Sequence, residues 1–130
     1  MFLDRDGTLV RDVRSGADPA SLELLSGAVS ALRALRAHGY RLVVVGNQAG
    51  VARGLYTVAE SRAVGSHLAA LLRVRGVWFD GYYLCPHHPG GAVARWSCVC
   101  DCRKPAPGLL MRAADDRSID LARSWAIGDS

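Results

Sequence analysis

Short apolar segments alternate with helical patterns along this chain, and this alternation constrains the fold more than any other feature. Four segments have the length and residue types of strands: residues 1–4, 41–46, 77–85 and 124–128. Three segments between them carry apolar residues at helical spacing: 28–38, 57–75 and 107–116. Strands that alternate with helices predict an α/β fold with a mostly parallel sheet and helices on both of its faces.

Local signals mark where the helices begin and end. Thr57 and Glu60 have the spacing of a capping box, which predicts a helix start. Gly39 and Gly76 follow the last apolar positions of two helical segments and predict their ends. Pro107 lies where the first turn of the third helix is expected, a position that tolerates proline.

Length and composition favour a single domain covering residues 1–130. Half of the residues are hydrophobic and 22% are charged, which excludes a disordered chain. No apolar segment approaches the length of a membrane span, and the N-terminus lacks the pattern of a signal peptide. We therefore expect a cytoplasmic protein without a membrane partner, and a monomer is the simplest expectation.

The net charge of +4 does not by itself indicate a nucleic-acid partner. Basic residues are spread along the chain without a dense block or interleaved aromatic residues. Fifteen of the sixteen basic residues are Arg, and the only lysine is Lys104. One lysine in an arginine-rich chain suggests a site that needs a compact positive charge.

A pair of carboxylates follows the first predicted strand. Asp4 and Asp6 are separated by one residue and precede Gly7, where the chain has left the predicted strand. Ligands bind at the carboxyl ends of strands in open α/β sheets. Such a pair can hold Mg²⁺ or divide the roles of nucleophile and general acid/base. The alternative is an ordinary acidic turn, because Asp-Gly is a common turn signal.

Two of the predicted connections are long, 5–27 and 86–105. All four cysteines lie between residues 85 and 102, one at the end of the strand predicted over 77–85 and three in the second long connection. Four residues form two close pairs separated by residues 88–99: Cys85, His87, Cys100 and Cys102. This set predicts a closed, structural Zn²⁺ site in a loop spanning 85–102. Cys98 could replace Cys100, and His88 could replace His87. Disulfides and inert thiols are the alternatives, the former disfavoured by the expected cytoplasmic setting.

Further polar residues follow the other predicted strands. Asn47 comes after the second strand. The planar guanidinium group of Arg53 can donate paired hydrogen bonds to phosphate or hydroxyl groups. Arg103 and Lys104 come directly after the last predicted zinc ligand, which would fix their positions. Asp129 follows the fourth strand. Each could be an ordinary turn or surface residue, but together they place acids, an amide and cations at one edge of the sheet.

These residues together resemble the haloacid dehalogenase (HAD) superfamily of phosphatases. Its first motif, Asp-x-Asp-Gly-Thr, is matched by residues 4–8, its lysine motif by Lys104 and its Gly-Asp motif by residues 128–129. Within that superfamily the chain is similar to the heptose-bisphosphate phosphatases. Residues 85–90 and 100–105 carry this likeness, whereas the histidinol-phosphate phosphatases have a shorter zinc loop. The resemblance covers essentially the whole chain.

The resemblance implies a Rossmann-like fold and hydrolysis of the 7-phosphate of a heptose 1,7-bisphosphate. Asp4 would form an aspartyl-phosphate, and Asp6 would protonate the leaving hydroxyl and then deprotonate water. Mg²⁺ would bind the side chains of Asp4 and Asp129 and the backbone carbonyl of Asp6. Lys104 would neutralise charge on the phosphoryl group. Three residues would position the small sugar-phosphate substrate: Asn47, Arg53 and Arg103.

The sequence departs from the family pattern at three points. Gly46 stands where the family usually has Thr or Ser, and Ser130 where a Lys commonly follows the Gly-Asp acid. Family members also continue beyond this point, so we expect the C-terminal part of the domain to be missing. The alternatives are a phosphatase for histidinol phosphate or another small sugar phosphate, one acting on nucleic-acid ends, or a catalytically inactive, zinc-stabilised binding domain.

Overall fold

The computed structural model describes residues 1–12 and 18–129. Its sheet has four parallel strands in the order β3-β2-β1-β4. Their bounds are Phe2–Leu3 for β1, Val43–Asn47 for β2, Gly81–Cys85 for β3 and Ala126–Ile127 for β4. The parallel α/β sheet predicted from the alternating segments is confirmed.

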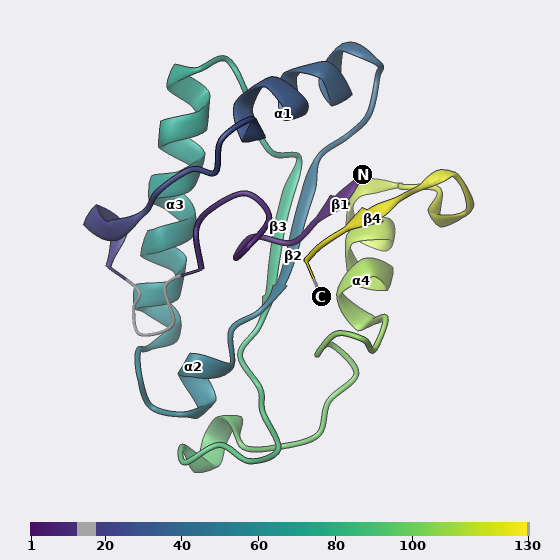
Figure 1. Ribbon diagram of the computed structural model, residues 1–130. Helices are drawn as coiled ribbons and strands as arrows, with labels where there is room; N and C mark the ends of the chain where they lie inside the picture. The colour runs from purple at the N-terminus through teal and green to yellow at the C-terminus, as the bar shows by residue number, and fades with distance from the viewer. Residues whose placement is uncertain (13–17, 130) are drawn as a thin grey trace.

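Helices pack on both faces of the sheet, as Figure 1 shows, with α1 and α3 on one side and α4 on the other. The helices have these bounds: α1 Ala28–Ala37, α2 Ala49–Ala52, α3 Val58–Val74 and α4 Gly108–Arg117. Three short 3₁₀ helices lie in connections: η1 Pro19–Ser21, η2 Ala94–Trp96 and η3 Leu121–Arg123.

The sheet separates two hydrophobic cores because successive side chains of a strand point to opposite faces. Val44 of β2 belongs to the core that also contains Leu32 of α1 and Leu68 of α3. Its neighbour Val45 faces the other core, with Leu109 of α4. Burial on both faces explains why the central strand is an uninterrupted apolar run.

The helix starts and stops follow the local signals closely. The Thr57 side chain accepts from the backbone of Glu60, whose carboxylate accepts from the Thr57 backbone, and this capping box opens α3. Gly39 and Gly76 have positive φ angles directly after α1 and α3. Pro107 is the N-cap of α4 rather than its first residue.

The predicted strand over 77–85 is too long. Only Gly81–Cys85 pairs with β2. Just before this strand, the Asp80 backbone N–H donates to the Leu42 carbonyl, and the Asp80 carboxylate accepts from the Leu42 N–H. Val77 is fully buried but lies outside the strand. The two outer strands predicted at 1–4 and 124–128 are likewise shorter, with two paired residues each.

The connection after β1 folds back on itself. Asp6 and Val10 form an isolated bridge, and Val10 also bridges to Leu24. Val10 and Leu9 are buried in the α1–α3 core, which anchors the segment that carries Asp6. Residues 13–17 of this predicted loop, and Ser130, lie outside the described residues.

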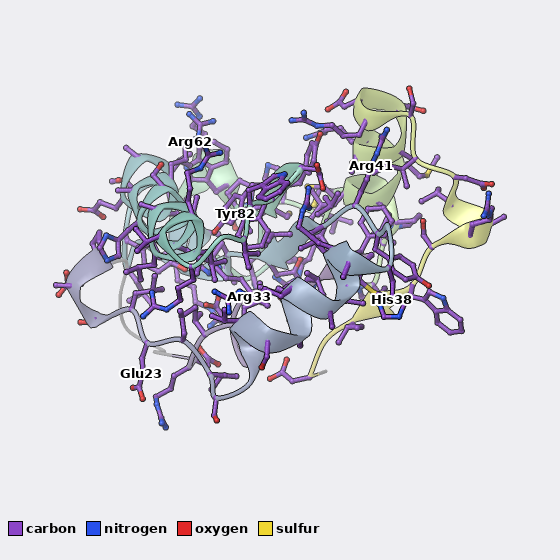
Figure 2. The ribbon with its side chains drawn as sticks, turned by 90° about the horizontal axis from the view of Figure 1, so that it is seen from above. Glu23, Arg33, His38, Arg41, Arg62 and Tyr82 are labelled. Atoms are coloured by element: carbon purple, nitrogen blue, oxygen red, sulfur yellow. The ribbon has the colours of Figure 1, made fainter. Side chains whose placement is uncertain are left out.

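Charged side chains lie around the periphery of the molecule. Figure 2 shows Arg41 and Arg62 projecting outward on different elements, whereas Tyr82 lies among the elements. None of the described helices is long and apolar enough to cross a bilayer.

Candidate active site and metal sites

The ion pair between Asp4 and Lys104 lies at the C-terminal edge of the sheet. Lys104 Nζ is 3.2 Å from Asp4 Oδ1, and both side chains are largely buried. The same oxygen accepts a 2.9 Å hydrogen bond from the backbone N–H of Arg5. Two donors on one oxygen fix the orientation of the Asp4 carboxylate as it leaves β1.

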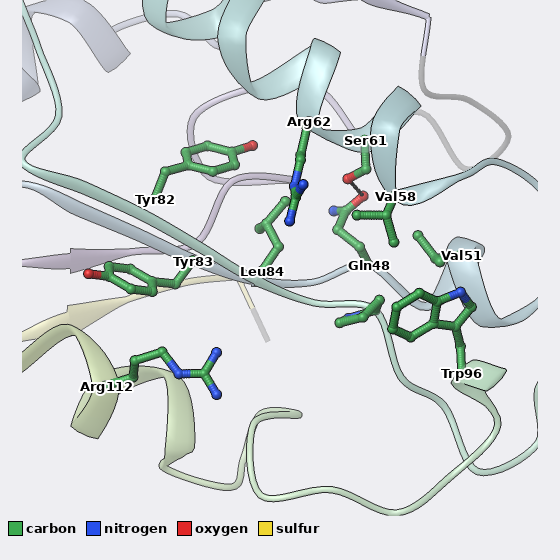
Figure 3. Close-up of a pocket in the computed structure, with 11 residues that line it drawn as sticks. Gln48, Val51, Val58, Ser61, Arg62, Tyr82, Tyr83, Leu84, Trp96 and Arg112 are labelled. Atoms are coloured by element: carbon green, nitrogen blue, oxygen red, sulfur yellow. Dashed lines mark hydrogen bonds between the residues drawn. The ribbon is translucent and has the colours of Figure 1, made fainter. Parts of the chain in front are cut away.

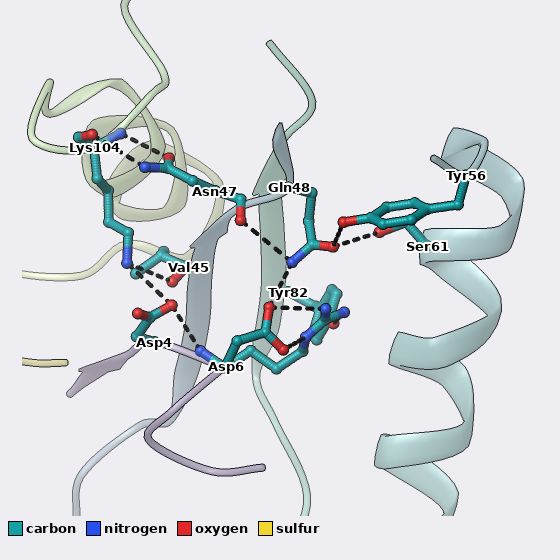
Figure 4. A network of polar contacts seen from close by, with 10 residues as sticks. Asp4, Asp6, Val45, Asn47, Gln48, Tyr56, Ser61, Tyr82 and Lys104 are labelled. Atoms are coloured by element: carbon teal, nitrogen blue, oxygen red, sulfur yellow. Dashed lines mark hydrogen bonds and ion pairs between the residues drawn. The ribbon is translucent and has the colours of Figure 1, made fainter. Parts of the chain in front are cut away.

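Lys104 is held in place by Asn47 (Figure 4). The Asn47 side chain donates to the Lys104 carbonyl at 3.0 Å and accepts from its N–H at 2.8 Å. The ammonium group also donates to the carbonyl of Val45 at 3.3 Å. Asn47, predicted to orient a substrate, therefore joins the end of β2 to the backbone that carries the lysine.

Asp6 is directed away from Asp4 and into a polar network. Its carboxylate accepts from Arg5 twice, Nε to Oδ1 and Nη2 to Oδ2, each at 2.9 Å. Arg5 is 5% exposed and also donates to the Tyr82 hydroxyl at 3.1 Å. Burial disfavours the charged guanidinium, but the contacts with Asp6 and Tyr82 outweigh it and raise the pKa of Arg5. Arg5 therefore stays charged beside Asp6.

Gln48 contacts Asp6 from the opposite side. Its Nε2 donates to Asp6 Oδ2 at 2.8 Å, and its Oε1 accepts from the hydroxyl of Tyr56 at 2.8 Å. Ser61 of α3 lies 3.4 Å from the same Oε1. Burial raises the pKa of Tyr56, which keeps its hydroxyl protonated as a donor. Sequence reasoning did not single out Gln48, Tyr56 or Ser61, because nothing local reveals that a glutamine at a strand end is buried.

Asp129 lies against the turn that follows Asp6. A Cβ at Gly7 would come within 2.0 Å of Asp129 Oδ2, so this approach requires glycine, as does the φ of +79° at Gly7. On the other side of this contact, a Cβ at Gly128 would be 3.3 Å from Asp4 Cβ. The acidic turn and the end of β4 are thus adjacent, and their carboxylate and carbonyl oxygens are the hard ligands that Mg²⁺ prefers.

Four side chains gather in the loop that follows β3. The Sγ atoms of Cys85, Cys100 and Cys102 and a ring nitrogen of His87 all lie within 4.8 Å of one another. The sulfur–sulfur separations are 2.9 to 3.5 Å, each shorter than the roughly 3.8 Å edge of a zinc–thiolate tetrahedron. Cys98 is exposed and outside this group.

The chemistry of this group suits a divalent cation. Burial raises the pKa of the Cys85 and Cys102 thiols, so three clustered sulfurs cannot all ionise without a compensating positive charge. Zn²⁺ supplies that charge and binds such a set in closed geometry. Among the described residues, this is the one such cluster of Cys, His, Asp or Glu ligand atoms.

Arg53 and Arg103, the two arginines predicted to position the substrate, lie near the zinc-binding loop, the segment 85–102 that carries the Cys/His cluster. Arg103 Nη1 is 3.4 Å from the carbonyl of His87, so its position follows from that loop. Arg53 is exposed at the end of α2. Partial desolvation and the positive charges of Arg103 and Arg53 lower the pKa of His88.

A cavity of about 340 Å³ lies beside this network rather than within it. Figure 3 shows Gln48, Ser61 and Trp96 on one side of the cavity and Tyr82, Tyr83 and Arg112 on the other, with Arg62 between them. Asp4, Asp6 and Lys104 do not line it. Gln48 therefore stands between this cavity and Asp6, and the ion pair of Asp4 and Lys104 lies outside the cavity.

Comparison with solved structures defines the class of protein. The chain superposes on an HAD-like phosphatase from Mesorhizobium loti with a TM-score of 0.93 and 36% identity, over 99% of this chain and 62% of that one. It also matches the D,D-heptose 1,7-bisphosphate phosphatase of B. bronchiseptica, solved with magnesium and phosphate, at a TM-score of 0.84 and 33% identity. That match covers all of this chain and 69% of the other. The fold is that of an HAD-like phosphatase.

Sequence comparison identifies the particular family. The chain is 42% identical over 129 residues to the D-glycero-beta-D-manno-heptose-1,7-bisphosphate 7-phosphatase of Yersinia pestis, and 44% identical to that of Escherichia coli K12. These alignments cover 99% of the chain and 69% and 68% of the relatives. No protein-family model matches. The chain belongs to the D-glycero-beta-D-manno-heptose-1,7-bisphosphate 7-phosphatase family.

Proposed function

We propose that this chain hydrolyses the 7-phosphate of D-glycero-D-manno-heptose 1,7-bisphosphate through an aspartyl-phosphate. The observation that carries the proposal is the 3.2 Å ion pair between Asp4 and Lys104 at the strand ends of a chain from this family. A carboxylate held beside a fixed ammonium group suits phosphoryl transfer, which depends mainly on positioning and charge neutralisation.

In the first step, an oxygen of Asp4 bonds to phosphorus while the bond from phosphorus to the sugar oxygen breaks. Asp6 gives its proton to the departing oxygen, so the sugar leaves as a neutral alcohol. Lys104 offsets negative charge shared by Asp4 and the phosphoryl group. Asn47 contributes by holding the backbone of Lys104 in place.

In the second step, water attacks the phosphorus of the aspartyl-phosphate and gives its proton to Asp6. The bond between Asp4 and phosphorus breaks, which restores the Asp4 carboxylate and releases inorganic phosphate. Dividing the hydrolysis into two displacements is the advantage of a carboxylate nucleophile. Asp6 ends the cycle protonated, ready for the next leaving group.

Mg²⁺ would be held by the side chains of Asp4 and Asp129 and the backbone carbonyl of Asp6, and when bound it supplies charge neutralisation for the phosphate oxygens. The fit rests on the contact between Gly7 and Asp129, which places hard oxygen donors side by side. Cys85, His87, Cys100 and Cys102 would hold Zn²⁺ in a structural role. Arg53 and Arg103 would bind anionic groups of the substrate.

Replacing the nucleophile tests the proposal. Asp4→Asn removes the attacking carboxylate, and we expect release of phosphate from heptose 1,7-bisphosphate to fall by more than about 10³-fold. Asp115→Asn, an exposed change on α4, is the matched control and should keep full activity. Activity that survives in Asp4→Asn would refute the assigned nucleophile. Binding of the sugar phosphate without turnover by the unchanged protein would instead indicate a binding domain.

We further propose that the protein acts as a monomeric domain in the cytoplasm on a small sugar phosphate rather than on nucleic acid. Two features support this: the basic side chains are dispersed, and the clustered thiols need a reducing compartment. A monomer mass in solution, with no salt-dependent binding of oligonucleotides, is the expected result. A stable dimer or tight binding of DNA ends would contradict it.

A further inference from the structure

Gln48 is a buried polar residue that the proposed reaction leaves without a role. It is 4% exposed, although it sits directly after a strand that ends at the site. All of its side-chain hydrogen-bonding atoms are engaged within 3.4 Å, by groups from three segments of the chain. A buried amide with this many partners is held in one place by them.

The partners also fix which way the amide points. Nε2 faces two groups that act as acceptors, the carbonyl of Asn47 at 3.3 Å and Asp6 Oδ2 at 2.8 Å. Oε1 faces the hydroxyls of Tyr56 and Ser61, which can donate. A flipped amide would set its oxygen against the Asn47 carbonyl. Gln48 therefore donates to Asp6 in any arrangement that satisfies its neighbours.

This hydrogen bond makes the two oxygens of Asp6 different. Oδ2 accepts from both Gln48 and Arg5, which occupies its two lone-pair directions. Among the residues that the structure describes, Oδ1 accepts from Arg5 Nε alone and keeps one direction open. Only Oδ1 therefore has room to accept or deliver a proton without first breaking a contact.

We propose that Gln48, anchored by Tyr56 and Ser61, is a positioning residue that holds Asp6 so that proton transfer takes place through Oδ1. Figure 4 shows the chain of contacts from α3 through Gln48 to Asp6. The inference rests on the proposed function, because it takes Asp6 as the general acid and base. It extends the site to the start of α3, where the capping box fixes the helix that carries Ser61.

Two substitutions separate the contact with Asp6 from the contact with α3. Gln48→Glu keeps an acceptor for Tyr56 and Ser61 but replaces the donor to Asp6 with a second carboxylate. Gln48→Met keeps the shape and removes both contacts. Tyr56→Phe removes only the anchor. Tyr83→Phe is the matched control, because its hydroxyl bonds to Asp116 on α4, away from Gln48.

The kinetic readout is the dependence on the leaving group. A sugar hydroxyl needs a proton as it departs, whereas p-nitrophenol does not. In Gln48→Met and Gln48→Glu we expect kcat/KM for the heptose bisphosphate to fall about tenfold or more, and that for p-nitrophenyl phosphate by less than about threefold. Tyr56→Phe should show a smaller loss of the same kind. Equal losses for both substrates would overturn the proposal, as would unchanged kcat/KM.

A double substitution gives the second kinetic readout. With Asp6→Asn in place, adding Gln48→Met should lower kcat/KM no further than about twofold, because Gln48 acts through Asp6. Losses that multiply in the double variant would show an independent role. Thermal unfolding of every variant identifies any that have lost the fold. If Gln48→Met is one of them, the kinetics of Gln48→Glu, which changes the structure less, decide the test.

A spectroscopic measurement works even if the proposed substrate is wrong. Gln48 is the only glutamine in the sequence, so ¹⁵N labelling of glutamine side chains yields one amide signal. We expect the protons on its Nε2 to exchange slowly, and Asp6→Ala to shift the signal and speed exchange about tenfold or more. An unchanged signal would refute the contact. An inactive protein with the expected signal would refute the substrate but keep the contact.

Discussion

At the scale of single residues, Gly46 is the clearest departure from the family pattern. A Cβ at this position would lie 3.4 Å from Asp4 Oδ1 and 3.1 Å from the end of the Leu84 side chain. A hydroxyl there would therefore stand beside the proposed nucleophile, where the family usually has Thr or Ser. The glycine itself supplies no side-chain donor to this part of the site, where Lys104 Nζ lies 3.2 Å from Asp4 Oδ1.

Restoring the hydroxyl should raise the rate. Gly46→Ser adds a donor that can bond a phosphate oxygen in the transition state, and losing one such donor elsewhere costs about 10²-fold. Because Leu84 must shift slightly, Gly46→Ala measures the steric effect alone. We expect kcat for the Ser variant to exceed that of the Ala variant by about tenfold or more. Equal rates in two folded variants would show that another donor already serves the phosphate.

At the scale of elements, the zinc-binding loop places the lysine of the site. Cys102 is buried in the core formed with α4, and Lys104 follows two residues later. The chain of this loop also contacts α2, since the Val93 N–H donates to the Ala52 carbonyl at 2.8 Å. Between Cys85 and Cys102 every residue of this loop is exposed or only partly buried, so a metal is an effective way to order it.

Removing the zinc should therefore affect both stability and activity. We expect one zinc per chain in the purified protein, retained in Cys98→Ser and lost in Cys102→Ser. A chelator should lower the free energy of unfolding by about 4 kcal/mol relative to protein in free zinc at 1,000 times its dissociation constant. Phosphatase activity should fall in parallel, because Lys104 loses its position. Metal analysis and denaturant titrations measure these effects, and a zinc-free protein of full stability would contradict them.

The helices and strands also show which parts of the fold and of the site can be predicted from the sequence. The start of α3 was predictable because Thr57 and Glu60 satisfy each other locally. The strand predicted over 77–85 was too long because apolar and aromatic residue types indicate burial, and a buried residue such as Val77 need not pair with a neighbouring strand. The motif residues of the site were visible because their chemistry is rare and their spacing regular. The role of Gln48 was not, since it depends on burial by residues far along the chain.

At the scale of the whole molecule, one carboxylate connects elements from different parts of the fold. Asp80 accepts from Arg36 of α1 at 2.9 Å and from the backbone N–H of Leu42, at the entrance to β2. It also directly precedes β3. Burial by itself disfavours the charged carboxylate, but these hydrogen bonds outweigh it and lower the pKa of Asp80 below its ordinary value of 3.8. The folded protein thus holds the ionised form more firmly than the unfolded chain does.

The sign of the resulting pH dependence follows from linkage. A carboxyl with a lowered pKa contributes its full stabilisation above the unfolded value of 3.8 and loses it as the pH falls through the folded pKa. Asp80→Asn should therefore cost about 2 kcal/mol of unfolding free energy at neutral pH. The difference from the unchanged protein should begin to shrink below about pH 4 and continue to shrink as the pH falls through the lowered folded pKa of Asp80. Because acid also protonates zinc ligands, the comparison is made against Asp115→Asn, an exposed change that should keep the unmodified profile. A difference that stays constant from pH 7 to pH 3 would mean that the ionised form of Asp80 is not what joins α1 to the sheet.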